Sequence, residues 1–194
     1  MHRIGKRIIV LGNSCAGKST LASALSQQTG YPWVELDALN WEAGRHGLVD
    51  HDPDLFATRM AAATSGPAWI VDGSYTAFSR RIVWPKADTL IWLDLRLPVV
   101  LYRWLTRTWQ RSRSGELLWG TNRDRFLHHF KLWARDDSLL YFIVHHHHTK
   151  RRNTQAAIRD PELRHLHVIR LRDRAQVAQF LADIADIEVQ AKAE

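Results

Sequence analysis

The sequence predicts an α/β protein whose parallel β-sheet is covered by helices on both faces. Two observations lead to this expectation. Short runs of β-branched and aromatic residues alternate along the chain with stretches of helical spacing, as they do in successive βαβ units. The first run, residues 7–11, also leads directly into a glycine-rich loop and then into a helix. The length of 194 residues suits one domain, or one domain with an inserted lid.

The predicted elements follow from apolar spacing and from the residues that start or stop each run. Gly30 ends the first predicted helix. Asp52 as N-cap and Pro53 in the first turn start the second helix, and residues 65–67 end it. The apolar run 139–144 suits a helix or a strand, and a cap at 136–138 favours the helix. The predicted strands are 7–11, 33–36, 69–71, 89–93 and 165–171, and the predicted helices are 19–28, 53–64, 98–111, 122–135, 138–158 and 174–184.

The glycine-rich loop has the G-x-x-x-x-G-K-S spacing of a phosphate-binding loop. Gly12 and Gly17 can take backbone angles closed to other residues, so that successive N–H groups point at one anion. Lys18 can reach the outer phosphates, and the Ser19 hydroxyl can bind magnesium. A glycine-rich turn with an incidental lysine is the alternative, and the order of strand, loop and helix argues against it. The expected nucleotide-binding residues are Gly12, Asn13, Ser14, Cys15, Ala16, Gly17, Lys18, Ser19 and Thr20.

Composition limits the cellular setting and the partners. We expect a cytoplasmic protein, because no apolar run is long enough to span a membrane and the single cysteine, Cys15, suits a reducing compartment. The net charge is +7, and residues 96–152 hold 12 Lys and Arg against 4 Asp and Glu. This segment therefore faces something anionic, either substrate phosphates or nucleic acid.

Three predicted strands are each followed by an aspartate: Asp37, Asp72 and Asp94. Parallel strands end at one edge of a sheet, where ligands bind, so the three carboxylates and the phosphate loop are expected to lie together. Asp72 resembles an aspartate that holds a magnesium-bound water, and Asp94 is its rival for that role. Asp37 is expected at the acceptor, where it can orient or deprotonate the attacking hydroxyl.

Basic side chains are the other candidates for the site. Arg103, Arg107 and Arg111 lie at i, i+4 and i+8 of one predicted helix, with no acid between residues 94 and 116. Guanidinium groups at this spacing can clamp a migrating phosphoryl group, and a solvated basic face is the alternative. The candidate substrate residues are Asp37, Asp72, Tyr75, Arg80 and Arg81, and the histidine run 145–148 is expected on a partly charged surface.

These features together resemble the P-loop kinases related to adenylate kinase, and more closely the bacterial branch known as DNA topology modulation proteins. The resemblance rests on the motifs at 12–19, 35–41, 69–75 and 87–94, on Arg103 and Arg107, and on 168–172. It implies a three-layer α/β core with a five-stranded parallel sheet, an acceptor-binding insert at about 37–66, and a basic lid at about 111–137 that closes over ATP. Adenylate kinases carry D-G-F-P-R where residues 72–76 read Asp-Gly-Ser-Tyr-Thr, so their proline and arginine are absent here.

The leading prediction is an ATP-dependent phosphotransferase that uses magnesium and acts on a small-molecule acceptor. Lys18, Asp37, Arg103 and Arg107 are the expected catalytic residues, and Ser19 and Asp72 are the expected magnesium residues, Asp72 through a water molecule. The absence of a GTPase N-K-x-D element favours ATP. The alternative is a nucleotide-dependent, nucleic-acid-binding regulator with ATPase activity, which the basic segment would serve.

Overall fold

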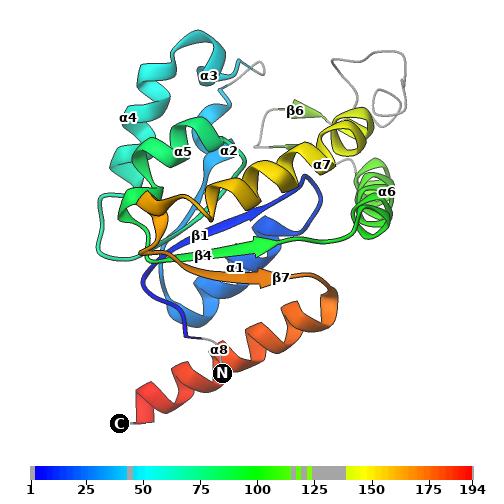
Figure 1. The fold of residues 1–194 in the computed structure, drawn as a ribbon. Helices are drawn as coiled ribbons and strands as arrows, with labels where there is room; N and C mark the ends of the chain where they lie inside the picture. The colour runs from blue at the N-terminus through cyan, green and yellow to red at the C-terminus, as the bar shows by residue number, and fades with distance from the viewer. Residues whose placement is uncertain (1–2, 43–45, 115–116, 119–121, 124–138, 194) are drawn as a thin grey trace.

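The protein is built around one parallel β-sheet of five strands, in the order β2-β3-β1-β4-β7 (Figure 1). The computed structural model describes residues 3–42, 46–114, 117–118, 122–123 and 139–193. Neighbouring strands of this sheet pair in parallel throughout. The strands are β1 (Arg7–Gly12), β2 (Trp33–Glu35), β3 (Trp69–Asp72), β4 (Thr89–Leu93) and β7 (His167–Leu171). The predicted five-stranded parallel sheet is therefore confirmed.

Helices lie on both faces of the sheet and complete three layers (Figure 1). The α-helices are α1 (Lys18–Thr29), α2 (Leu36–Asn40), α3 (Leu48–His51), α4 (Pro53–Ala63), α5 (Thr76–Ile82), α6 (Leu97–Ser114), α7 (Leu139–Ala157) and α8 (Arg174–Ala193). Two short 3₁₀ turns, η1 (Trp84–Lys86) and η3 (Pro161–Leu163), join helices to strands. No helix within these described ranges is long and apolar enough to cross a membrane.

The strand sequences are apolar on both faces because both faces are buried. Along β1, Ile8 and Val10 pack into one cluster with α1, α6 and α8. Ile9 and Leu11 point to the opposite face and pack into a second cluster with α2, α3 and α4. Successive residues of a strand alternate between faces, so β1 contributes to both halves of the core.

The ends of α1 and α4 follow the predicted start and stop signals. The Asp52 side chain accepts a hydrogen bond from the backbone N–H of Leu55 at 3.0 Å, and Pro53 occupies the first turn of α4. Gly30 ends α1 with φ of 74°, and its N–H donates to the carbonyl of Ser26 at 2.8 Å.

Some segments differ from the sequence prediction, and others lie outside the described residues. Leu36 begins helix α2 instead of ending the second strand, so Asp37 lies in the first turn of a helix. Asn122–Arg123 is strand β6, which pairs antiparallel with β5 (Leu117–Leu118), where a helix was predicted; residues 124–135 lie outside the described residues. The expectation of a helix over 138–158 is confirmed by α7. Most of the expected lid at 111–137 also lies outside the described residues, and its role, like that of the 37–66 insert, stays a prediction.

Candidate active site

The phosphate loop connects the end of β1 to the start of α1. Gly17 has φ of 93° and Cys15 has φ of 62°, so two residues of this short loop take left-handed backbone angles. A side chain at Gly12 would place its Cβ 3.0 Å from the Cβ of Leu93 and 3.1 Å from the Leu93 carbonyl oxygen. Glycine at position 12 therefore lets the end of β1 lie against the end of β4.

Internal hydrogen bonds hold the loop in a closed curve. The Asn13 carbonyl accepts from the Lys18 ammonium at 3.2 Å and from the Ala16 N–H at 3.1 Å. The Ser14 N–H donates to the Asn13 side-chain oxygen at 2.8 Å. Burial lowers the pKa of Lys18, while the Asp72 and Asp37 carboxylates oppose that shift. The Lys18 ammonium is thus held against the loop, within electrostatic reach of both predicted carboxylates.

Asp72 lies at the end of β3 and faces the start of α1. It is 2% exposed, and its carboxylate accepts from the Ser19 hydroxyl at 2.7 Å and from the Trp33 indole N–H at 3.1 Å. Burial raises the pKa of Asp72, and the two hydrogen bonds oppose that shift. A hydroxyl and a carboxylate at this separation are oxygen ligands of the kind that magnesium prefers, so Ser19 and Asp72 fit a magnesium ion or its bound water.

Asp94, the rival carboxylate, is already engaged by two arginines. Its side chain accepts from Arg151 at 2.9 Å and also from Arg170, whose guanidinium lies over the Trp92 ring at 4.5 Å. Two guanidinium groups compensate its single negative charge, which leaves little attraction for a cation. This geometry favours Asp72 over Asp94 as the magnesium residue.

Asp37 extends from the first turn of α2 and is held by Tyr75. The Tyr75 hydroxyl donates to the Asp37 carboxylate at 2.8 Å. Burial, together with the Asp37 charge, raises the pKa of Tyr75, so the tyrosine remains a proton donor. The pair therefore presents an oriented carboxylate within electrostatic reach of Lys18.

The predicted arginines divide into two groups. The Arg103 guanidinium donates to the Ala16 carbonyl at 2.6 Å, and Arg107 is close enough to lower the pKa of Lys18. Both arginines line a cavity of about 340 Å³ between the phosphate loop, α6 and α8, which Thr20 also lines. The structure brings neither Arg80 nor Arg81 to Asp37, and their substrate role stays a prediction.

Arg80 and Arg81 have other surroundings in the fold. Arg80 forms an ion pair with Asp160 and lies over the Trp84 ring, while Arg81 is exposed.

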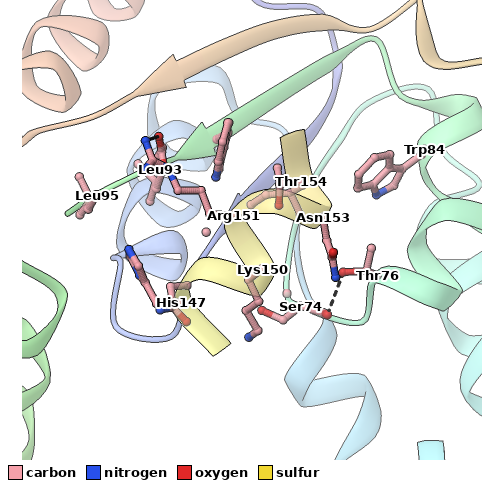
Figure 2. A pocket seen from close by; sticks show the side chains of 16 residues that line it. Ser74, Thr76, Trp84, Leu93, Leu95, His147, Lys150, Arg151, Asn153 and Thr154 are labelled. Atoms are coloured by element: carbon pink, nitrogen blue, oxygen red, sulfur yellow. Dashed lines mark hydrogen bonds and ion pairs between the residues drawn. The ribbon is translucent and has the colours of Figure 1, made fainter. Parts of the chain in front are cut away.

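Helix α7 supplies side chains that the sequence interpretation did not assign to the site. Figure 2 shows His147, Lys150 and Arg151 around a cavity of about 110 Å³ that Asn13, Gly73 and Trp84 also line. His147 is buried, and its Nδ1 lies 3.2 Å from the Asn13 amide nitrogen, so the expectation of a surface histidine is wrong at this position.

A sequence signal for this cavity wall did exist. Residues 147, 150, 151 and 154 lie at i, i+3, i+4 and i+7, and such spacing places side chains on one face of a helix.

Among the residues that the structure describes, no group of three or more His, Cys, Asp or Glu side chains could hold a metal ion.

The sheet order, the glycine loop and the Ser19–Asp72 pair define the class of the fold, which is that of the P-loop proteins. No family model matches the chain, and no curated protein matches its sequence. Among solved structures, a shikimate kinase from Bacteroides thetaiotaomicron matches with a TM-score of 0.52 and 16% identity, over 94% of this chain and 97% of that one.

Two further structures are similar over nearly the whole chain. A gluconokinase from Sinorhizobium meliloti 1021 has a TM-score of 0.45 and 18% identity over 99% of this chain and 94% of its own. A shikimate kinase from Acinetobacter baumannii, in complex with shikimate, has a TM-score of 0.47 and 16% identity over 97% and 96%. At 16% identity the similarity to the Bacteroides thetaiotaomicron structure shows the fold alone, and the chain has the three-layer α/β fold of a P-loop kinase.

Proposed function

We propose that this protein is an ATP-dependent phosphotransferase that moves the γ-phosphoryl group to a hydroxyl of a small-molecule acceptor. The observation that carries the proposal is that Lys18 lies within electrostatic reach of two carboxylates that have different hydrogen-bond partners. Asp72 is bonded to the Ser19 hydroxyl, which belongs to the phosphate loop. Asp37 instead accepts a hydrogen bond from Tyr75, which is not part of the loop. One carboxylate therefore suits the donor side and the other suits the acceptor side.

On the donor side, the loop N–H groups and Lys18 bind the phosphates of ATP. Ser19 and Asp72 would hold magnesium, which neutralises charge on the phosphate oxygens when bound. Arg107 lies near Lys18, where its guanidinium can stabilise negative charge on the migrating phosphoryl group. Arg103 donates a hydrogen bond to the Ala16 carbonyl, so it holds the loop in position. It also adds a positive charge beside the loop.

On the acceptor side, Asp37 accepts the proton of the attacking hydroxyl. The acceptor oxygen forms a bond to the γ-phosphorus while the bond from that phosphorus to the oxygen of ADP breaks, and ADP leaves. Tyr75 orients Asp37 and keeps one of its oxygens engaged, which leaves the other free to accept the proton. The products are ADP, a phosphorylated acceptor and a proton.

A transfer assay tests this function. The protein is incubated with γ-labelled ATP, magnesium and a set of hydroxyl acceptors that includes sugars, sugar acids, nucleosides and nucleotides. We expect label to appear on at least one acceptor, and Lys18→Ala, which removes the cation of the loop, to abolish the transfer. Release of inorganic phosphate alone, at a rate that no acceptor changes, would contradict the proposal.

The described basic side chains favour the phosphotransferase over the nucleic-acid-binding regulator. Arg103 donates to the phosphate loop, and Arg151 and Arg170 both contact Asp94. The charges of these three arginines are thus used within the fold. A relationship to the DNA topology modulation branch stays a prediction.

A further inference from the structure

The indole N–H of Trp84 is a buried hydrogen-bond donor without an acceptor. Trp84 begins the η1 turn, is fully buried, and its Nε1 has no hydrogen-bond partner among the described residues. A buried donor that stays unpaired has lost its water and gained nothing in exchange, so native structures rarely keep one without a reason. Trp84 lines the cavity below α7, and a ligand there can supply the missing acceptor.

Lys150 brings a positive charge to the same cavity. Its ammonium lies 4.4 Å from the centroid of the Phe142 ring, and within the described ranges no carboxylate forms an ion pair with it. Burial lowers the pKa of Lys150 to about 8, with a further decrease from Lys18 and an opposing effect from Asp37. Lys150 therefore lies within electrostatic reach of the transfer centre and carries a charge that an anion would stabilise.

Arg151 and Asp94, which also line the cavity, are bound to each other. The Arg151 guanidinium contacts Asp94 at 2.9 Å, and Arg170 contacts the same carboxylate. His147 faces the Asn13 amide, and burial lowers its pKa. Lys150 is therefore the basic side chain of this wall that forms no ion pair within the described residues, and the Arg151–Asp94–Arg170 group adds a net charge of +1 beside it.

The wall also offers hydroxyl and amide groups, beside the apolar side chains of Leu11, Trp92, Leu93 and Leu95. Figure 2 shows Thr76 and Asn153 on the same side of the cavity as Trp84, with Ser74 beside them. Thr154 also lines this wall. A cavity with the Lys150 cation, one unpaired N–H and several hydroxyl and amide groups suits a small anion that itself carries hydroxyl groups.

We propose that this cavity binds the phosphate acceptor as a hydroxylated anion, with the Lys150 ammonium on its negative charge and the Trp84 N–H on one of its oxygens. The inference rests on the proposed function and specifies the substrate class. A carboxylate and a phosphate ester share the required chemistry, and the probes below separate them. A neutral polyol lacks the charge that Lys150 would bind.

The indole resonance of Trp84 reports binding directly. The protein is labelled with ¹⁵N-tryptophan, and Trp84→Phe assigns the Trp84 signal among the nine tryptophans. Gluconate and glycerol phosphate are then titrated beside their neutral counterparts, sorbitol and glycerol. We expect at least one anion to move the Trp84 signal downfield in a saturable way, with no comparable shift from its neutral counterpart. No saturable shift with either anion, or equal shifts from the neutral compounds, would overturn the proposal.

Matched variants test the two named donors. Trp84→Phe removes the unpaired N–H, and Trp69→Phe is its control. The Trp69 indole N–H is also buried and has no partner within the part of the chain that the structure describes, but Trp69 lies on β3 and does not line the cavity. We expect Trp84→Phe to weaken anion binding about tenfold, without lowering the melting temperature more than the control does. Equal anion affinity in the two variants, measured by calorimetry, would refute the role of Trp84.

Lys150→Met tests the charge, and Lys86→Met, at an exposed lysine of η1, is its control. We expect the Lys150 variant alone to lose at least tenfold in anion affinity. The experiment separates this inference from the proposed function, because binding is read without turnover. Anion binding without phosphoryl transfer would defeat the function alone. Transfer to an acceptor whose KM is the same in Lys150→Met and in wild type would defeat the inference alone.

Discussion

Gly17→Ala perturbs the phosphate loop at a point where the structure allows its cost to be worked out. Gly17 has φ of 93°, and an alanine in this region costs about 1–2 kcal/mol. The new Cβ would lie 2.7 Å from the Arg103 Nη1, so the guanidinium must move away. It would then lose its 2.6 Å hydrogen bond to the Ala16 carbonyl, at a cost of about 1 kcal/mol for a partly exposed group. We expect a total loss of about 2–3 kcal/mol.

Gly30→Ala is the matched control for this variant. Gly30 also has a positive φ, of 74°, but a Cβ there would meet nothing within 4 Å. Its cost is therefore the backbone term alone, about 1–2 kcal/mol. Free energies of unfolding from urea titrations measure both variants. For a chain of 194 residues each kcal/mol corresponds to a melting-temperature decrease of about 2–4 °C.

The Arg103 contact can be isolated by a double-mutant cycle. In an Arg103→Met background the hydrogen bond is already absent, so Gly17→Ala should cost the same as Gly30→Ala. If Gly17→Ala and Gly30→Ala destabilise the wild-type protein equally, or if the Arg103→Met background changes nothing, the described packing of Arg103 on the loop is refuted.

Three more predictions address the proposed chemistry. Asp72→Asn removes a carboxylate from the magnesium residues, so the magnesium concentration for half-maximal turnover should rise at least about tenfold; an unchanged magnesium titration would count against Asp72. Tyr75→Phe removes the hydrogen bond to Asp37, so kcat should fall about tenfold or more while the KM for ATP stays constant. An unchanged kcat would exclude an orienting role of Tyr75. Lys150, with its pKa lowered to about 8, is charged below that pH and neutral above it, so kcat/KM for the acceptor should fall as the pH rises through 8. Lys150→Arg stays charged and should remove this decline; the same decline in the variant would assign it to another group.

The sheet and the phosphate loop could be predicted because their signals are local. The β-branched run 7–11, the glycines at 12 and 17 and the N-cap at Asp52 act through neighbours in the sequence. Leu36 is the exception to this agreement. It is an apolar residue that directly follows β2, and in the structure it begins α2. Apolar character alone does not separate the last residue of a buried strand from the first residue of a buried helix.

The acceptor side was less predictable because it depends on contacts between distant segments. Tyr75 lies 38 positions from Asp37, and His147 lies 134 positions from Asn13. The ion pairs of Arg80 with Asp160 and of Arg151 with Asp94 have the same long-range character. Sequence spacing places such residues on a helix face, but only the packing of α7 over the sheet decides which of them line a cavity.

A crystal structure with magnesium and a non-hydrolysable ATP analogue would test the central claim most directly. The account predicts the triphosphate along residues 12–19, magnesium or its water at Ser19 and Asp72, and the γ-phosphate facing Asp37. It also predicts that the cavity lined by Trp84 and Lys150 stays open beyond that phosphate. A triphosphate bound elsewhere, or magnesium at Asp94 with Asp72 left on Trp33, would contradict it.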